Sequence, residues 1–187
     1  MSRILILVVA FIVVVKVSDA QEFAGIPVDS YLNEVVSKFT QKGFQLKSDN
    51  LSQKPVVSMV GSTLSTKIEL FIAYHPTTKE VWRFSVYLAE AKDWKQLKSE
   101  YLDHRAILID KYGQPLSSQS AFKSPYIEGD GNEMEAVTNE KIKFESVWLN
   151  KSSISITKWK QVKIDYINPE NYKTYKEFVG SQNKENF

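Results

Sequence analysis

The side chains that could transfer protons are few and lie far apart along the chain. Of the two histidines, His75 precedes a proline in an expected turn, which favours a role in that turn over catalysis. His104 follows Asp103 within an expected helix, where adjacent residues point in different directions. The chain has no G-x-S-x-G motif for a serine nucleophile and no cysteine for a thiol nucleophile. The sequence therefore predicts no catalytic residue.

Clustered oxygen ligands are the second feature with chemical meaning. Residues 128–135 bring together Glu128, Asp130, Asn132 and Glu133, and calcium prefers carboxylate and amide oxygens on a loop. The stretch lacks the EF-hand spacing, so an exposed loop without a metal is the alternative interpretation. No histidine and glutamate spacing fits zinc, and no glycine-rich phosphate loop is present. We therefore expect no cofactor and no metal.

Aromatic and basic side chains indicate binding rather than catalysis. Phe71, Arg83 and Tyr87 occupy alternate positions of expected strands, opposite the side chains that would face the interior. Tyrosine and arginine are enriched where proteins bind partners. Trp148 and Trp159 flank the last expected hairpin beside lysines, which fits either a rim for a glycan, a peptide or a lipid surface, or a core position. These five residues are the predicted partner-binding residues.

The helices that would position these residues follow from hydrophobic periodicity. Helical spacing predicts one helix over about 30–42 and a second over about 93–112. Asp29 and Asp93 are the expected N-caps, because a carboxylate can accept hydrogen bonds from free amides of the first turn. Residues 134–139 fit either a short helix or a strand, and the polar tail 169–187 either covers the sheet or leaves it open.

Alternating apolar residues predict the strands. Residues 114–133 are rich in proline, serine, glycine and acidic residues, and are expected to form a long exposed loop. A helix followed by three strands occurs twice, which suggests half-repeats over 23–90 and 91–168 of a single domain, 21–168. The predicted class is α+β, with an antiparallel sheet of about six strands and two helices packed on one face. The predicted strands are 55–60, 67–74, 80–88, 142–149, 152–158 and 161–167.

The first twenty residues have the pattern of a secretory signal peptide. A basic start, Met1-Ser2-Arg3, precedes an apolar run, and Ser18-Asp19-Ala20 offers a cleavage site. The absence of cysteine excludes disulfides and bacterial lipidation, so we expect an exported protein, periplasmic or secreted and not lipid-anchored. After the leader we expect no transmembrane segment. A formal net charge of +2 gives no general case for binding nucleic acid.

Three stretches are distinctive in combination. They are FAGIPVD at 23–29 with KGF at 42–44, Trp94, Leu97 and Tyr101 with KYGQP at 111–115, and VKIDYI at 162–167. Together they resemble a family of small exported bacterial proteins of unknown function, similar in architecture to β-lactamase-inhibitor-like domains. The resemblance covers nearly all of residues 23–168 and implies tandem helix-plus-strands units. It also implies a curved sheet whose helix-free face is open for binding a partner, and it carries no catalytic motif.

These observations favour a non-enzymatic binding domain. It would recognise a protein, a peptide or a glycan through the open face of its sheet. A hydrolase acting on envelope or extracellular polymers is one alternative, and a structural component of an envelope assembly is another. The identity of the partner and the oligomeric state do not follow from the sequence.

Overall fold

The computed structural model describes residues 21–47, 55–63, 66–149 and 151–185, so the leader expected at 1–20 lies outside the described residues. The helices are α1 (Leu32–Gln41), α2 (Trp94–Tyr112), α3 (Glu133–Thr138) and α4 (Pro169–Glu185). The strands are β1 (Glu22–Phe23), β2 (Ile26–Pro27), β3 (Gln45–Leu46), β4 (Val56–Thr63), β5 (Thr66–Tyr74), β6 (Val81–Leu88), β7 (Ser117–Phe122), β8 (Ile142–Trp148), β9 (Ser152–Ile156) and β10 (Val162–Ile167).

The class is α+β, and the main sheet is antiparallel with eight strands in the order β3-β4-β5-β6-β10-β9-β8-β7. The prediction of about six strands was wrong because both edge strands lack the usual pattern. Strand β3 has only two residues. Strand β7 lies within the expected loop 114–133, and its serine-rich side chains are mostly exposed, so no apolar alternation marks it.

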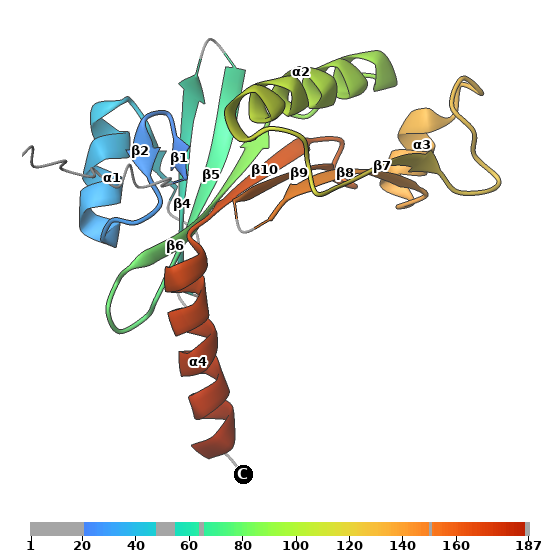
Figure 1. The fold of residues 1–187 in the computed structure, drawn as a ribbon. Coiled ribbons are helices and arrows are strands. Elements are labelled where there is room, and N and C mark those ends of the chain that lie inside the picture. The colour runs from blue at the N-terminus through green and yellow to red at the C-terminus, as the bar shows by residue number, and fades with distance from the viewer. Residues whose placement is uncertain (1–20, 48–54, 64–65, 150, 186–187) are drawn as a thin grey trace, which may run out of the picture.

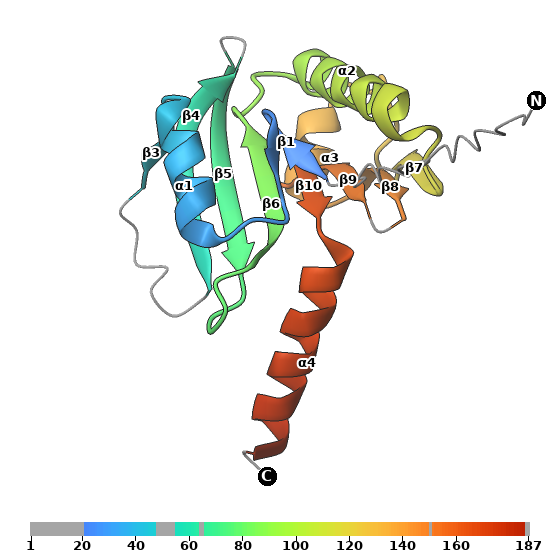
Figure 2. The same ribbon diagram turned by 60° about the vertical axis from the view of Figure 1, so that its left-hand side comes forward.

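Each half of the chain consists of one long helix followed by four strands. Helix α1 precedes β3–β6 and helix α2 precedes β7–β10, and the two groups meet where β6 pairs with β10 (Figure 1). Helix α1 lies beside the first group and α2 beside the second (Figure 2). The expectation of three strands after each helix is thereby corrected to four.

Helix α1 begins two residues later than predicted. Its N-cap is Tyr31, which makes no side-chain capping bond, and not Asp29. The reason is tertiary: Tyr31 forms a β-bridge with Glu80, and the amide of Leu32 donates to the carbonyl of Lys79. These contacts hold the chain extended up to Tyr31 and delay the start of the helix.

Helix α2 agrees closely with the prediction. The Asp93 carboxylate accepts a hydrogen bond from the Gln96 amide at 2.8 Å, which confirms this residue as the N-cap. Inside, the Tyr101 ring meets Phe144 edge-on, and its hydroxyl lies 3.0 Å from Ser146 Oγ. The helix is therefore anchored to β8 through both apolar and polar contacts.

The register of the strands defines two faces of the sheet. Leu70, Val86 and Ile164 are cross-strand neighbours and are almost fully buried, and we call their side the inner face. Alternation places the intervening residues on the opposite side, the outer face. There Glu69 pairs across the sheet with Tyr87, which in turn pairs with Lys163. Unlike their inner-face neighbours, these residues are only half-buried.

One irregularity redirects a tryptophan. Ala73 pairs with Arg83 and Tyr74 pairs with Val81, so Trp82 is an extra residue in β6. Such a bulge bends the strand and re-aims its side chains. The sequence predicts Trp82 on the same face as Phe84. In the structure its ring instead lies beside the Arg83 guanidinium, whose carbon is 4.7 Å from the ring centroid.

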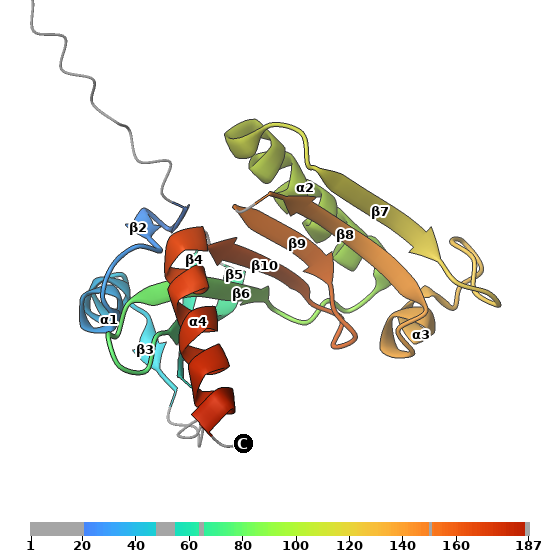
Figure 3. The same cartoon turned by 60° about the horizontal axis from the view of Figure 1, so that its bottom comes forward.

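The C-terminal tail, whose position the sequence does not decide, forms helix α4. It stacks Tyr172 and Tyr175 on Trp82, with ring centroids 4.9 and 5.0 Å away, and then projects beyond the sheet (Figures 1 and 2). Its Phe178 contacts His75, which is buried and not at the surface as its turn position suggests. The Nδ1 atom of His75 accepts hydrogen bonds from two amides of the turn. Figure 3 shows α4 and α2 on opposite sides of the strands.

Buried side chains from both halves form one hydrophobic cluster, whose first and last members in the sequence are Ile26 and Ile164. Its centre holds Phe39, which packs against Phe44 and Phe84. Among the described residues, no helix has the length and apolar character needed to cross a membrane.

The buried hydroxyl of Tyr166 should make the stability of the folded protein depend on pH in the alkaline range. The ring stacks on Phe23, and burial raises the pKa of its hydroxyl to about 12. In the unfolded state this tyrosine ionises near pH 10. Between pH 10 and pH 12 the side chain is therefore ionised in the unfolded state but still protonated in the folded state, and this difference favours unfolding. This contribution is intact below about pH 10, and it should fall by roughly 3 kcal/mol between pH 10 and pH 12.

Urea unfolding at pH 9, 10, 11 and 12 measures this loss in the wild type and in Tyr166→Phe. The variant cannot ionise at this position, so the wild type should lose more stability than the variant over the same interval. Parallel losses in the two proteins would contradict the assignment to Tyr166.

Candidate functional site

The candidate site lies at the centre of the outer face. The structure brings together three of the five predicted binding residues there. The Phe71 and Tyr87 rings meet edge-on with centroids 5.4 Å apart, and Arg83 lies on the same face of β6. We call these three residues and their neighbours on the outer face the outer-face patch. Its members are Phe71, Trp82, Arg83, Ser85, Tyr87, Lys163 and Asp165.

Asp165 and Lys163 complete the polar part of the patch. The Ser85 hydroxyl donates to Asp165 Oδ1 at 2.5 Å, and Lys163 Nζ lies 2.7 Å from Asp165 Oδ2. The Lys163 ammonium also lies over the Tyr87 ring, 5.9 Å from its centroid. Asp165 is 9% exposed, so its charge is compensated by close partners and not by water.

Arg83 has no such compensation. Within the part of the chain that the structure describes, its guanidinium makes no ion pair or hydrogen bond and lies over the Trp82 ring. The Nε atom of Arg83 and the Nε1 atom of Trp82 are both buried without a hydrogen-bond acceptor there. Buried donors of this kind are rare in folded proteins because each one costs free energy.

The electrostatics of the patch keep Tyr87 protonated. Burial raises the pKa of its hydroxyl, the negative charges of Asp165 and Glu69 raise it further, and Arg83 opposes them. The Tyr87 hydroxyl is therefore a hydrogen-bond donor at neutral pH.

Two lysines in or beside the patch are paired with carboxylates. Lys47 binds Glu69 at 2.6 Å, and Lys163 binds Asp165. Arg83 is left as one positive charge among aromatic rings. An arginine in this setting can bind an oxyanion through its planar fork of N–H groups.

A groove of about 680 Å³ lies at the end of the sheet. It is lined by Val60 and Glu69 of the outer face and by Ile68 and Leu88 of the inner face. Glu69 pairs across the sheet with Tyr87, which is the nearest link between this groove and the patch.

The two predicted tryptophans of the last hairpin do not join the patch. Trp148 is 3% exposed, and its indole N–H donates to the Gly113 carbonyl at 2.7 Å, so it is a core residue. Trp159 is 60% exposed in the turn between β9 and β10. It lines a separate hollow of about 350 Å³ with Ile142 and Ile156.

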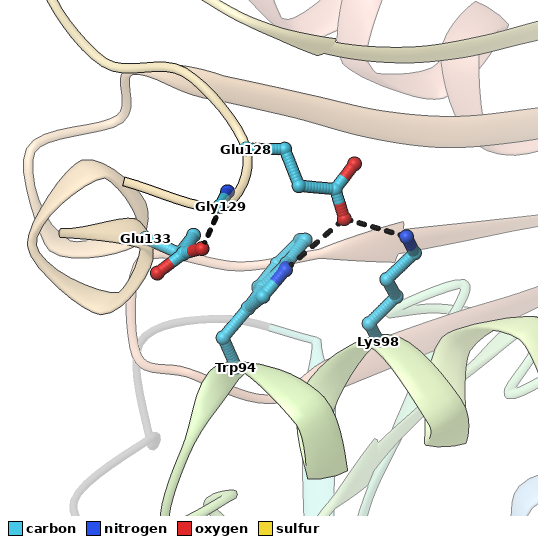
Figure 4. Close-up of polar contacts among 5 residues, drawn as sticks. All are labelled: Trp94, Lys98, Glu128, Gly129 and Glu133. Carbon is cyan, nitrogen blue, oxygen red and sulfur yellow. Dashed lines mark hydrogen bonds and ion pairs between the residues drawn. The ribbon is translucent and has the colours of Figure 1, made fainter. Parts of the chain in front are cut away.

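The acidic loop is tied to helix α2. Glu128 Oε1 accepts hydrogen bonds from Lys98 Nζ at 2.5 Å and from Trp94 Nε1 at 3.2 Å (Figure 4). The bond from Lys98 is the main cause of a lowered pKa at Glu128. Loop and helix border a groove of about 460 Å³, into which the partly exposed Leu102 also extends.

The other loop carboxylates bind the backbone of the loop itself. Glu133 accepts from the Gly129 amide (Figure 4), and Asp130 accepts from the amides of Ile127 and Asn132. These bonds lower the pKa of Asp130. In the described ranges no three residues that commonly bind metals come together, so the calcium interpretation of 128–135 gains no support.

Sequence reasoning missed four members of the patch: Trp82, Ser85, Lys163 and Asp165. A signal existed for three of them. Ser85 lies midway between Arg83 and Tyr87, and Lys163 and Asp165 alternate with apolar residues, which places all three on the outer face. No sequence signal places Trp82 there, because the bulge that turns it arises from the pairing of β5 with β6.

Comparison with known proteins identifies no relative: no family model, no curated protein and no solved structure matches the chain.

Proposed function

We propose that this protein is an exported, non-enzymatic binding domain that recognises a partner through the outer-face patch. The observation that carries the proposal is the unequal burial of the two faces. Inner-face residues such as Leu70 and Val86 are fully buried, while Phe71, Arg83 and Tyr87 are only partly buried near the centre of the sheet. A cluster of tyrosine, phenylalanine and arginine has the composition of a binding hot spot. Export is supported by the leader pattern at 1–20.

We also infer that α1 and α2 cover the inner face together. Phe39 of α1 contacts Phe84, and Tyr101 of α2 contacts Ser146. The pairing register puts Phe84 and Ser146 on the same side of the sheet as Val86. This arrangement, with its two helix-plus-four-strand units, supports a β-lactamase-inhibitor-like architecture as a proposal and leaves the outer face as the binding surface.

The hydrolase alternative has less support. The Nδ1 atom of His75 accepts two amide hydrogen bonds, and the Nδ1 atom of His104 lies 2.9 Å from the Glu100 carbonyl. Neither histidine contacts a serine or carboxylate side chain within the described ranges. The polar pair Ser85 and Asp165 therefore lacks the histidine of a serine hydrolase.

Affinity capture tests the proposed function. The wild-type protein and the single variants Phe71→Ala and Tyr87→Ala would be immobilised and exposed to an extract of the source organism. If the patch binds the partner, each variant should retain less than a tenth of the partner captured by the wild type, because hot-spot truncations typically cost 2 kcal/mol or more. Mass spectrometry quantifies the captured protein or glycan.

Ile107→Ala is the matched control. Ile107 is 61% exposed on α2, away from the patch, so its truncation removes apolar surface of similar kind without touching the outer face. Melting temperatures of all variants identify losses caused by unfolding. Equal capture by wild type, Phe71→Ala and Tyr87→Ala would refute the binding role of the patch. Capture as part of a fixed stoichiometric complex would instead favour the structural-component alternative.

A further inference from the structure

We infer that the ligand of the outer-face patch is a polypeptide that presents one acidic side chain next to an apolar one, and that Arg83 binds its carboxylate. The inference rests on the proposed function and adds the chemical class of the partner. Its starting point is the unpaired guanidinium of Arg83, which no protein carboxylate reaches among the described residues.

Among the described residues, the Arg83 side chain contains a buried donor without an acceptor, which costs free energy. The side chain is half-buried, and its Nε atom is buried without an acceptor in the described part of the chain. Trp82 Nε1, in the side chain that stacks with this guanidinium, is a second buried donor without an acceptor. Both atoms are covered by protein, so a ligand would bind the accessible part of the guanidinium. A ligand that supplies oxygen acceptors is favoured there, because no protein acceptor within the described ranges compensates the charge.

Within the described structure, the patch carries a single unpaired charge. Lys163 is neutralised by Asp165, and Lys47 is neutralised by Glu69, so Arg83 is the one unpaired charge of the patch in the described structure. One unpaired cation complements one carboxylate. A nucleic acid or an anionic membrane would require a cluster of unpaired cations, because each carries many charges.

Apolar surface lies beside the charge. The edge-on rings of Phe71 and Tyr87 lie on the same face as Arg83 and are only partly buried. A residue next to the acidic one in the ligand could pack on these rings, while the carboxylate meets the guanidinium. This combination of a charged group and an aromatic contact is available in peptides, and the protonated Tyr87 hydroxyl adds a donor.

The experiment uses short peptides of defined sequence and NMR of the full chain. The probe is the N-acetylated, C-amidated tetrapeptide Ala-Phe-Glu-Ala, compared with the same peptide carrying glutamine or phosphoserine in place of glutamate. The side-chain N–H signals of Trp82 and Arg83 report binding at the site, and the indole signals of Trp148 and Trp159 serve as internal references. We expect the glutamate peptide to shift the Trp82 and Arg83 signals and to bind at least tenfold more tightly than the glutamine peptide.

Variants assign the carboxylate to Arg83. In Arg83→Gln the preference for the glutamate peptide should disappear, and in Arg83→Lys it should be reduced because an ammonium lacks the planar fork. Trp82→Phe keeps a stacking ring beside the guanidinium and removes only a buried N–H, so the preference for the glutamate peptide should remain in this variant. Lys143→Ala is the control, since Lys143 is an exposed cation of β8 that pairs with Glu145.

Each remaining outcome overturns the inference. Equal binding of the glutamate and glutamine peptides, an unchanged preference in Arg83→Gln, or no shift at Trp82 and Arg83 would each exclude Arg83 as a carboxylate site. Tighter binding of the phosphoserine peptide would replace the carboxylate with a phosphate. If partner capture still depends on Phe71 and Tyr87 in any of these cases, the proposed function stands and only the ligand class fails.

Discussion

Phe39→Ala is expected to lower the free energy of unfolding by about 3–5 kcal/mol, the largest effect of any substitution considered. Phe39 is fully buried on α1, and its ring meets Phe23, Phe44 and Phe84 at centroid distances of 6.0, 5.2 and 5.4 Å. Truncation removes the apolar contacts of the ring and leaves a cavity that these neighbours cannot fill without moving.

Two features near Phe39 limit how far the structure can relax. Gly61 of β4 approaches the Phe44 ring so closely that an added Cβ atom would lie 2.6 Å from it. Phe44 is therefore confined between Gly61 and Phe39, and it has little freedom to close the cavity. We expect the cost to fall in the upper half of the range for this reason.

Urea unfolding monitored by fluorescence measures the loss. Ile107→Ala, on the exposed surface of α2, provides the comparison and should change stability by less than about 0.5 kcal/mol. A loss below about 1.5 kcal/mol for Phe39→Ala would contradict the packing described for α1.

Asp165→Ala is expected to have the second-largest effect, a loss of about 2–4 kcal/mol. The carboxylate binds both the Ser85 hydroxyl and the Lys163 ammonium, and the side chains of Asp165 and Lys163 are only 12% and 23% exposed. Removing one partner of a largely buried pair leaves the other charge without compensation. The substitution would also change the outer-face patch, because Lys163 would become a second unpaired cation beside Arg83.

A double-mutant cycle separates the ion pair from other effects of truncation. Lys163→Met removes the charge that Asp165 compensates, so Asp165→Ala should cost less in that background than in the wild type. Asp165→Asn keeps an acceptor for Ser85 and should lie between the wild type and Asp165→Ala. A coupling energy near zero between positions 163 and 165 would mean that solvent already screens the pair.

The Asp165 prediction also bears on the ligand. The Asp165→Asn variant would have two unpaired cations in the patch. The ratio of its affinity for the phosphoserine peptide to its affinity for the glutamate peptide should therefore be higher than the same ratio for the wild type. The unmodified patch, with its single free charge, is matched to one carboxylate.

Local patterns in the sequence were sufficient for much of the framework. The α+β class, the strands around Leu70, Phe84 and Ile164, and helix α2 with its Asp93 cap follow from residues that are close in sequence. Such features depend on hydrophobic periodicity and on capping chemistry, both of which act over a few residues. The alternation in β5 and β6 also placed Phe71 and Tyr87 on a common face, as the structure has them.

The tertiary structure alone decided the edge strands, the start of α1 and the position of Trp82. Strands β3 and β7 carry no periodic signal, because their edge positions do not bury an apolar face. Tyr31 is held extended by Glu80, a residue far along the chain. The bulge that brings Trp82 to Arg83 depends on how β5 pairs with β6.

The same distinction holds for the candidate site. The sequence by itself determined which face of the strands carries Phe71, Arg83 and Tyr87, because side chains alternate along every strand. Only the tertiary structure decided that Trp148 is buried and that Asp165 forms an ion pair with Lys163. It also decided that Arg83 has no ion-pair partner among the described residues. Pairing of charges depends on distances between strands that are separate in sequence, and no local pattern encodes those distances.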